Sequence, residues 1–221
     1  MLNVYRKTVL IIALALIAPI ASASIMLRTG VDAAQVVQSA GTTDSFWDIS
    51  TDGGNTYNDA IVNYDAQICC NMGTVANTAA WITDSGRAGS ASTGWGVRNP
   101  VYATRTFDLT DYDLSTVGLE ATWRVADNLS QILLNGNVVH GSVTSTWFTD
   151  RNLSVATGSA DFLAGLNTLT IIGTSLNSRW DGFWFDGLVD GQKASVPEPT
   201  SLALFGLGLS GFGFSRMKKK S

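Results

Sequence analysis

Short runs of alternating apolar and polar residues, separated by turn residues, fill the middle of this sequence. The clearest run is LEATWRV at residues 119–125, whose first, third, fifth and seventh side chains are apolar and would share one face of a strand. About ten such runs are interrupted by Gly, Asn, Asp and Ser, and long helical periodicities are scarce. This pattern predicts an all-β domain.

A two-residue turn gives the sharpest local prediction. Asn135-Gly136 separates the apolar runs 130–134 and 137–140, which is the pattern of a hairpin with a type I′ turn. Further strands are predicted at 101–107, 168–172 and 182–189. Short strands at this density in one domain predict a two-sheet sandwich of the jelly-roll type.

The N-terminus has the three parts of a secretory signal peptide. Arg6 and Lys7 precede an apolar stretch, which ends at the small residues Ala21-Ser22-Ala23. We therefore predict a signal peptide at residues 1–23, with Ser24 as the first residue of the exported protein. The alternative interpretation is a buried helix of the mature domain.

The C-terminus has a different pattern. Pro197 and Pro199 interrupt regular structure, and the sixteen residues from Thr200 to Ser215 carry no charge. As a helix they would be about 24 Å long, slightly short of a bilayer span. Four cations follow, and cationic flanks stay on the cytoplasmic side, so the body of the protein would lie across the membrane. These cations are Arg216, Lys218, Lys219 and Lys220.

Val196-Pro197-Glu198-Pro199, the apolar segment and the basic tail together resemble the PEP-CTERM sorting signal of bacterial envelope proteins. The resemblance implies processing by an exosortase after transient inner-membrane insertion. It also implies a Gram-negative envelope, with an outer-surface or matrix location linked to exopolysaccharide and biofilm. A plain C-terminal anchor is the alternative. The predicted layout is a signal peptide at 1–23, a β-sandwich at 24–189, a linker at 190–195 and the sorting signal at 196–221.

The charge of the body excludes one class of partner. The chain has 14 Lys and Arg and 18 Asp and Glu. Six of the cations but only one of the acids, Glu198, lie in the terminal segments, so the body carries a net charge of about −9. Such a body repels phosphate backbones, so nucleic-acid binding is not expected.

A second resemblance covers most of the body in short pieces. The sequence is similar to galactose-binding-like β-sandwich modules, which implies that fold for residues 24–189. The pieces are TGVD at 29–32, DSFW at 44–47, AWI at 80–82, TFDL at 106–109, Trp123 with ADN at 126–128, LNG at 134–136 and AGLNTL at 164–169.

The composition argues against catalysis. The chain has one histidine, His140, and no arrangement typical of a Ser-His-Asp triad. Glycoside hydrolysis needs two facing carboxylates, and Glu120 is the only glutamate of the body. We therefore predict no catalytic residue and no enzyme activity.

Seven tryptophans in a small domain admit two interpretations. Indole rings stack on sugar rings, and Asp, Asn and Arg bind sugar hydroxyls. Trp95 and the group Arg179, Trp180 and Asp181 are the candidate ligand-binding residues, because they lie in predicted loops. The alternative is that tryptophans fill the core, which we expect above all for Trp123.

The acidic turns also admit two interpretations. Asp108, Asp111 and Asp113, and the segment 52–59, offer the oxygen ligands that Ca²⁺ prefers. Asp and Asn also favour turns through bonds to their own backbone. No cofactor is required on either interpretation.

The adjacent cysteines Cys69 and Cys70 leave three states open: a vicinal disulfide, reduced thiols, or bonds to another chain. Taken together, the sequence predicts an exported protein that binds or joins an extracellular polysaccharide matrix without catalysis. The alternative is a structural surface protein whose sandwich binds protein partners.

Overall fold

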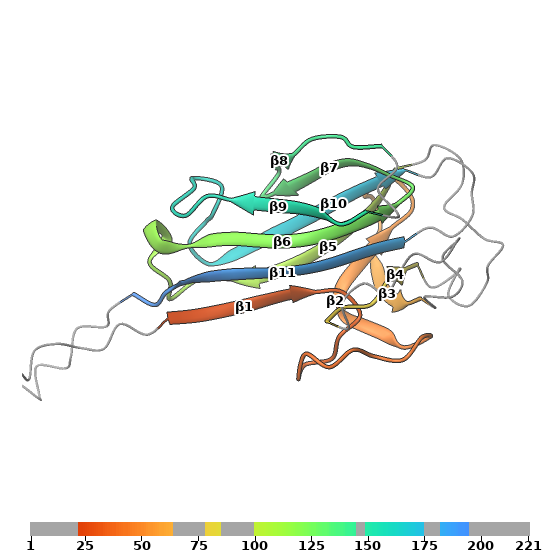
Figure 1. The fold of residues 1–221 in the computed structure, drawn as a ribbon, viewed down its shortest axis with the longest axis horizontal. Coiled ribbons are helices and arrows are strands. Elements are labelled where there is room, and N and C mark those ends of the chain that lie inside the picture. The colour runs from red at the N-terminus through yellow and green to blue at the C-terminus, as the bar shows by residue number, and fades with distance from the viewer. Residues whose placement is uncertain (1–21, 64–77, 85–99, 145–148, 175–181, 195–221) are drawn as a thin grey trace, which may run out of the picture. The chain divides into compact units, whose positions relative to one another are not determined.

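The computed structural model describes residues 22–63, 78–84, 100–144, 149–174 and 182–194. Their regular structure is antiparallel β-strand with one short 3₁₀ turn (Figure 1). The elements are β1 (Ser22–Arg28), β2 (Thr43–Ser50), β3 (Asn58–Val62), β4 (Ile82–Thr83), β5 (Pro100–Asp108), η1 (Leu114–Thr116), β6 (Gly118–Ala126), β7 (Asn128–Leu134), β8 (Asn137–His140), β9 (Arg151–Val155), β10 (Leu166–Thr174) and β11 (Gly182–Gln192).

The strands form one hydrogen-bonded path that folds over on itself. The order is β8-β7-β10-β5-β2-β3-β4-β11-β6-β9, and β1 pairs with β11. Strands β9, β6, β11 and β1 form one layer, and β8, β7, β10, β5 and β2 form the other (Figure 1). Rings from the two layers meet between them: the centroids of Trp47 in β2 and Phe185 in β11 are 5.7 Å apart. The predicted all-β, two-sheet sandwich is confirmed.

The alternation along β6 explains why this strand lies in the middle of its layer. Its apolar residues Leu119, Ala121, Trp123 and Val125 are buried between the layers, as the sequence predicts. Burying one large apolar side chain stabilises a fold by about 1.5–3 kcal/mol. A one-residue shift in register would turn the whole set outward, so this face fixes the position of β6.

The hairpin between β7 and β8 has the predicted turn. Asn135 and Gly136 have φ angles of 53° and 83°, the left-handed conformations that a type I′ turn requires. The Asn135 side chain also binds the β10 region: its amide donates to Asn167 Oδ1 at 2.7 Å, and its oxygen accepts from the Thr168 N–H at 2.9 Å. The turn therefore connects β7 to β8 and is also hydrogen-bonded to β10 through the Asn135 side chain.

The outer edge of β1 is closed by side chains from the other layer. The Arg105 guanidinium donates to the carbonyl oxygens of Met26 at 2.7 Å and Arg28 at 2.9 Å. The Trp47 indole N–H donates to the same Arg28 carbonyl at 2.9 Å. These bonds join the two layers along the side that β1 borders.

A buried carboxylate accompanies this arginine. Asp44 is fully buried and accepts from the backbone N–H of Gly30 at 2.6 Å and of Phe46 at 2.9 Å. Burial raises the pKa of Asp44, and its bonds and the charge of Arg105 oppose that rise. Burial also lowers the pKa of Arg105 to about 10, so its guanidinium stays charged at neutral pH.

Strand β1 pairs along its whole length with the C-terminal part of β11. Ser22 lies opposite Gln192 and Arg28 opposite Asp186. Strand β11 continues past Val189, so the first three residues of the segment predicted as a linker are paired with β1 or β6. We call the end at which β1 starts and β11 ends the base, and the opposite end of the strands the loop end.

The predicted signal peptide up to Ala21 and the predicted sorting helix lie outside the described residues. Within the part of the chain that the structure describes, no helix has the length and apolar composition of a membrane span.

Candidate ligand-binding site

Five strand ends meet at the loop end. Thr174 of β10 lies opposite both Pro100 of β5 and Asn128 of β7. Gly182 of β11 lies opposite Ala126 of β6. Loops carried on a rigid sheet are where binding sites usually form, so this end is the candidate site.

The internal segments outside the described residues connect to this end. Their neighbours lie there: Ile82 faces Phe183 at the start of β11, and Val143 bridges to Leu129 at the start of β7. These segments are 64–77, 85–99, 145–148 and 175–181. They contain the predicted ligand-binding residues Trp95, Arg179, Trp180 and Asp181, and the cysteines Cys69 and Cys70, all of which lie outside the described residues.

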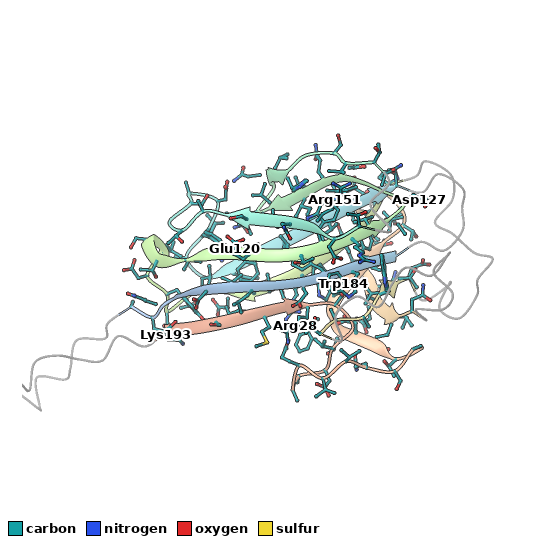
Figure 2. All side chains as sticks on the ribbon, viewed as in Figure 1. Arg28, Glu120, Asp127, Arg151, Trp184 and Lys193 are labelled. Atoms are coloured by element: carbon teal, nitrogen blue, oxygen red, sulfur yellow. The ribbon has the colours of Figure 1, made fainter. Side chains whose placement is uncertain are left out.

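An ion pair forms part of the described surface at this end. Arg124 Nε of β6 donates to Asp150 Oδ1 at 2.6 Å, and only 9% of the Arg124 side chain is exposed, against 55% for Asp150. Arg124 also lies directly opposite Trp184 of β11. Figure 2 shows Trp184, Asp127 and Arg151 toward this end of the strands, away from Lys193 at the base. The exposed carboxylate oxygens of Asp150 can accept bonds from a ligand's hydroxyl groups.

The described tryptophans belong to the core. Trp47 and Trp123 have no exposed surface, and Trp81 and Trp184 are 2% exposed. Trp184 donates its indole N–H to the Ala79 carbonyl at 3.1 Å. None of these four rings can stack on a sugar in this conformation, so the core interpretation holds for each of them. Trp147, like the candidates Trp95 and Trp180, lies outside the described residues.

The acids predicted as calcium ligands have separate partners at the base. Asp108 accepts from the Thr110 hydroxyl and N–H, and these bonds lower its pKa. Asp113 caps η1 by accepting from the Ser115 N–H at 3.0 Å. Asp111 Oδ2 lies 3.8 Å from the Lys193 ammonium nitrogen.

The segment 52–59 is organised in the same local way. The Asp52 carboxylate accepts bonds from Ser50, Asn55 and Thr56, and these hydrogen bonds lower its pKa. In the described part of the chain, no group of three or more His, Cys, Asp or Glu side chains could hold a metal ion. Local turn bonds account for the positions of these acids, and Ca²⁺ binding stays a prediction.

The residues weighed for catalysis are held in structural contacts. Glu120 accepts from the Ser154 hydroxyl at 2.5 Å across the β6–β9 pair, and its neighbour on β11 is Leu188. The His140 ring packs edge-on against Trp123, with centroids 5.1 Å apart. Neither contact forms a nucleophile–base pair or a pair of facing carboxylates.

Two residues of this surface are not predicted from the sequence. Asp150, just before β9, accepts from Arg124, and Trp184 lies opposite Arg124 in the register of β11 and β6; neither belongs to a local motif. Only the order of the strands brings them together, so no signal in the sequence points to this group.

Comparison with known protein families identifies a motif in the C-terminal segment. The sequence matches the PEP-CTERM protein-sorting motif over residues 195–219. The chain therefore carries this motif at the position that the sequence pattern predicts, and the motif indicates an exported protein that is sorted through an exosortase. A comparison with curated proteins found no match.

A comparison with solved structures finds matches at low similarity. A family 35 carbohydrate-binding module from Clostridium thermocellum is 11% identical, with 75% of this chain and 97% of that chain covered and a TM-score of 0.37. An apo cyclase from Fischerella sp. is also 11% identical, with 78% and 98% covered and a TM-score of 0.40. Likeness at this level supports no conclusion about ligand or activity.

Proposed function

We propose that this protein is an exported, noncatalytic component of a Gram-negative envelope that binds or joins the extracellular polysaccharide matrix after processing by an exosortase. The sorting motif at 195–219 supports the export half of the proposal. One observation supports the binding half: the segments that carry Trp95 and Trp180 connect to the strand ends at the loop end.

The chemistry of this end suits a sugar ligand. A sugar ring offers C–H groups to an indole plane and hydroxyl groups to carboxylates and guanidinium groups. Trp95 and Trp180 are the proposed stacking residues, with Arg179 and Asp181 as hydrogen-bonding residues. The ion pair of Arg124 and Asp150 supplies charged groups on the described part of the loop end.

The position of the sorting motif is compatible with this use. The motif begins two residues after Lys193, at the base, and β11 separates the base from the loop end. Eleven residues of strand span about 35 Å at 3.2–3.4 Å per residue. A glycan at the loop end would therefore lie about the length of β11 away from Lys193, the last paired residue before the motif.

The test uses the exported protein and the exopolysaccharide of its own host. We expect saturable co-sedimentation and a change in tryptophan fluorescence. Trp95→Ala and Trp180→Ala should each weaken binding at least tenfold and leave the melting temperature unchanged. Leu166→Ala is the matched control, because Leu166 is 67% exposed and lies at the base. No binding by the native protein at millimolar sugar units would overturn the binding half.

A second candidate is a structural surface protein that binds protein partners. Met26 and Leu188 favour it: they face each other across β1 and β11 and are 37% and 40% exposed. Surface retention in cells that lack exopolysaccharide, together with its loss in Leu188→Lys, would support this candidate. Retention that depends on exopolysaccharide would contradict it.

A further inference from the structure

The bond predicted for signal cleavage lies inside a paired strand. Ala23 lies opposite Gly191, and Ser24 lies opposite Asp190. Both pairs belong to the base, where β11 leads toward the sorting motif. Removal of the N-terminal segment therefore changes the chain at the point where its first and last strands meet.

Asp190 occupies the centre of this contact. Its Oδ1 accepts from the hydroxyls of Ser24 at 3.0 Å and Ser22 at 3.3 Å, and from the Gly191 N–H at 3.0 Å. The ion pairs found among the described residues join other acids to cations, and Asp190 is in none of them. Burial, and after it the charge of Asp190, raises the pKa of Tyr112. The partners found for Asp190 among the described residues are thus hydroxyl groups and a backbone N–H, and none of them is a cation.

Cleavage supplies a cation next to this charge. Hydrolysis adds water across the Ala23–Ser24 peptide bond, leaving a carboxylate on Ala23 and an α-ammonium group on Ser24. Three covalent bonds separate that nitrogen from the Ser24 hydroxyl, which already binds Asp190. The new ammonium group is therefore within a few ångströms of the carboxylate, and a terminal residue can turn to meet it.

We infer that cleavage of the Ala23–Ser24 bond creates an amino terminus at Ser24 that pairs with Asp190 and holds the start of β1 against the end of β11. The inference rests on the export half of the proposed function. It assigns Asp190 as a positioning residue for the processed terminus.

The pairing of β1 with β11 also determines the order of cleavage and strand docking. Proteases cut exposed, unpaired segments, and the Ala23–Ser24 bond is paired once β1 has docked on β11. Hydrolysis must therefore precede docking. Cleavage removes the pairs of Ser22 with Gln192 and Ala23 with Gly191, and the new ion pair replaces their hold on β11.

The first measurement is the identity of the mature terminus. The full chain is exported from a Gram-negative host, and mass spectrometry of the recovered protein should find Ser24 as the first residue. A chain that keeps its signal segment would contradict export itself. A mature terminus at another residue would overturn the inference alone.

The second measurement is the pKa of the Ser24 amine, read from the rate of acylation against pH. An ordinary α-amine has a pKa of about 7.7–8.0, and an exposed carboxylate partner should raise it by about half a unit. At pH 7 acylation should then be about threefold faster in Asp190→Asn. Acylation is read at Ser24 itself, because Lys193 and the tail lysines are amines that react as well. Tyr112, whose pKa is raised above its ordinary 10.0, stays neutral across this range.

Asp186→Asn is the matched control. Asp186 lies on the same face of β11, but Arg28 already holds it at 2.8 Å. We expect this variant to keep the native pKa of the Ser24 amine, because Asp186 is not the partner of the terminus. Equal amine pKa values in the native protein and in Asp190→Asn would overturn the inference, even with Ser24 as the confirmed first residue. Export would stand in that case.

Discussion

The base and the loop end are built in opposite ways. At the base, polar side chains bind their own turns or neighbouring strands: Asp108 holds Thr110, Asp113 caps η1, and Asn135 binds β10. At the loop end, Arg124 and Asp150 are joined across strands, and Asp150 keeps much of its surface exposed. The comparison teaches that bonds from side chains to backbone hold the turns of the base, whereas an ion pair between two side chains holds the described part of the loop end.

The largest expected effect tests the core that both ends share. Trp123→Ala should lower the free energy of unfolding by about 3–5 kcal/mol, because a fully buried indole leaves a cavity between the layers. Urea denaturation of the exported protein measures this loss. Trp123→Phe should lose less, since a ring still fills part of the space. An equal loss for both would show that the Trp123 ring is not packed as described.

The buried carboxylate gives the next effect. Asp44→Asn should cost about 1–3 kcal/mol, because an amide cannot accept both backbone N–H bonds as the carboxylate does. Chemical denaturation at neutral pH measures it.

The same variant tests a pH dependence. Burial raises the pKa of Asp44 above its ordinary 3.8, so the folded protein binds a proton there more tightly than the unfolded chain. The stability that Asp44 contributes is full below about pH 4 and falls as pH rises through the folded-state pKa. Native stability minus that of Asp44→Asn should therefore fall over this window. A difference that rises with pH would contradict the direction.

A matched pair of glycines sharpens the description of the base. Gly136→Ala should cost about 1–2 kcal/mol, because Gly136 has a φ of 83° in the type I′ turn. Gly141→Ala is the control: a Cβ at Gly141 would meet no atom within 4 Å, and the φ of Gly141 is not in the left-handed region. Thermal denaturation compares the two, and equal effects would show that the turn carries no conformational demand.

The smallest effects compare the two ends directly. Asp150→Asn removes the partner of a nearly buried guanidinium and should cost about 0.5–1 kcal/mol. Asp111→Asn removes an exposed pair at 3.8 Å and should cost nothing measurable. Double-mutant cycles with Arg124 and Lys193 measure the two couplings. A stronger coupling at the base would reverse the comparison.

The sequence predicts those parts of the fold that depend on neighbouring residues. The alternation at 119–125 identifies the buried face of β6. Asn135-Gly136 identifies the turn between β7 and β8. Both predictions succeed because they depend on local geometry. The strand predicted at 182–189 is shorter than β11, which ends at Gln192. Asp190 and Gln192 have the polar character of a linker, so the sequence alone does not predict them as strand residues. Their pairing with β1 makes them part of β11.

The candidate site is predicted less well for the same reason. Trp184 is aromatic on a strand face that would be exposed, and only the contact with Ala79 explains its burial. The pair of Arg124 and Asp150 joins residues 26 positions apart and has no sequence pattern. The burial of Trp184 and the Arg124–Asp150 pair both depend on which distant strands pair. The spacing of neighbouring residues in one sequence does not reveal that pairing.

The occupied carbonyl groups of β1 have a consequence for contacts between copies of this chain. An open strand edge can recruit the backbone of a second copy and start a fibre. Arg105 and Trp47 already fill the acceptors of Met26 and Arg28, so an incoming strand would have to displace a charged donor and an indole to attach there. This edge of β1 is therefore a poor template for the backbone of a second copy.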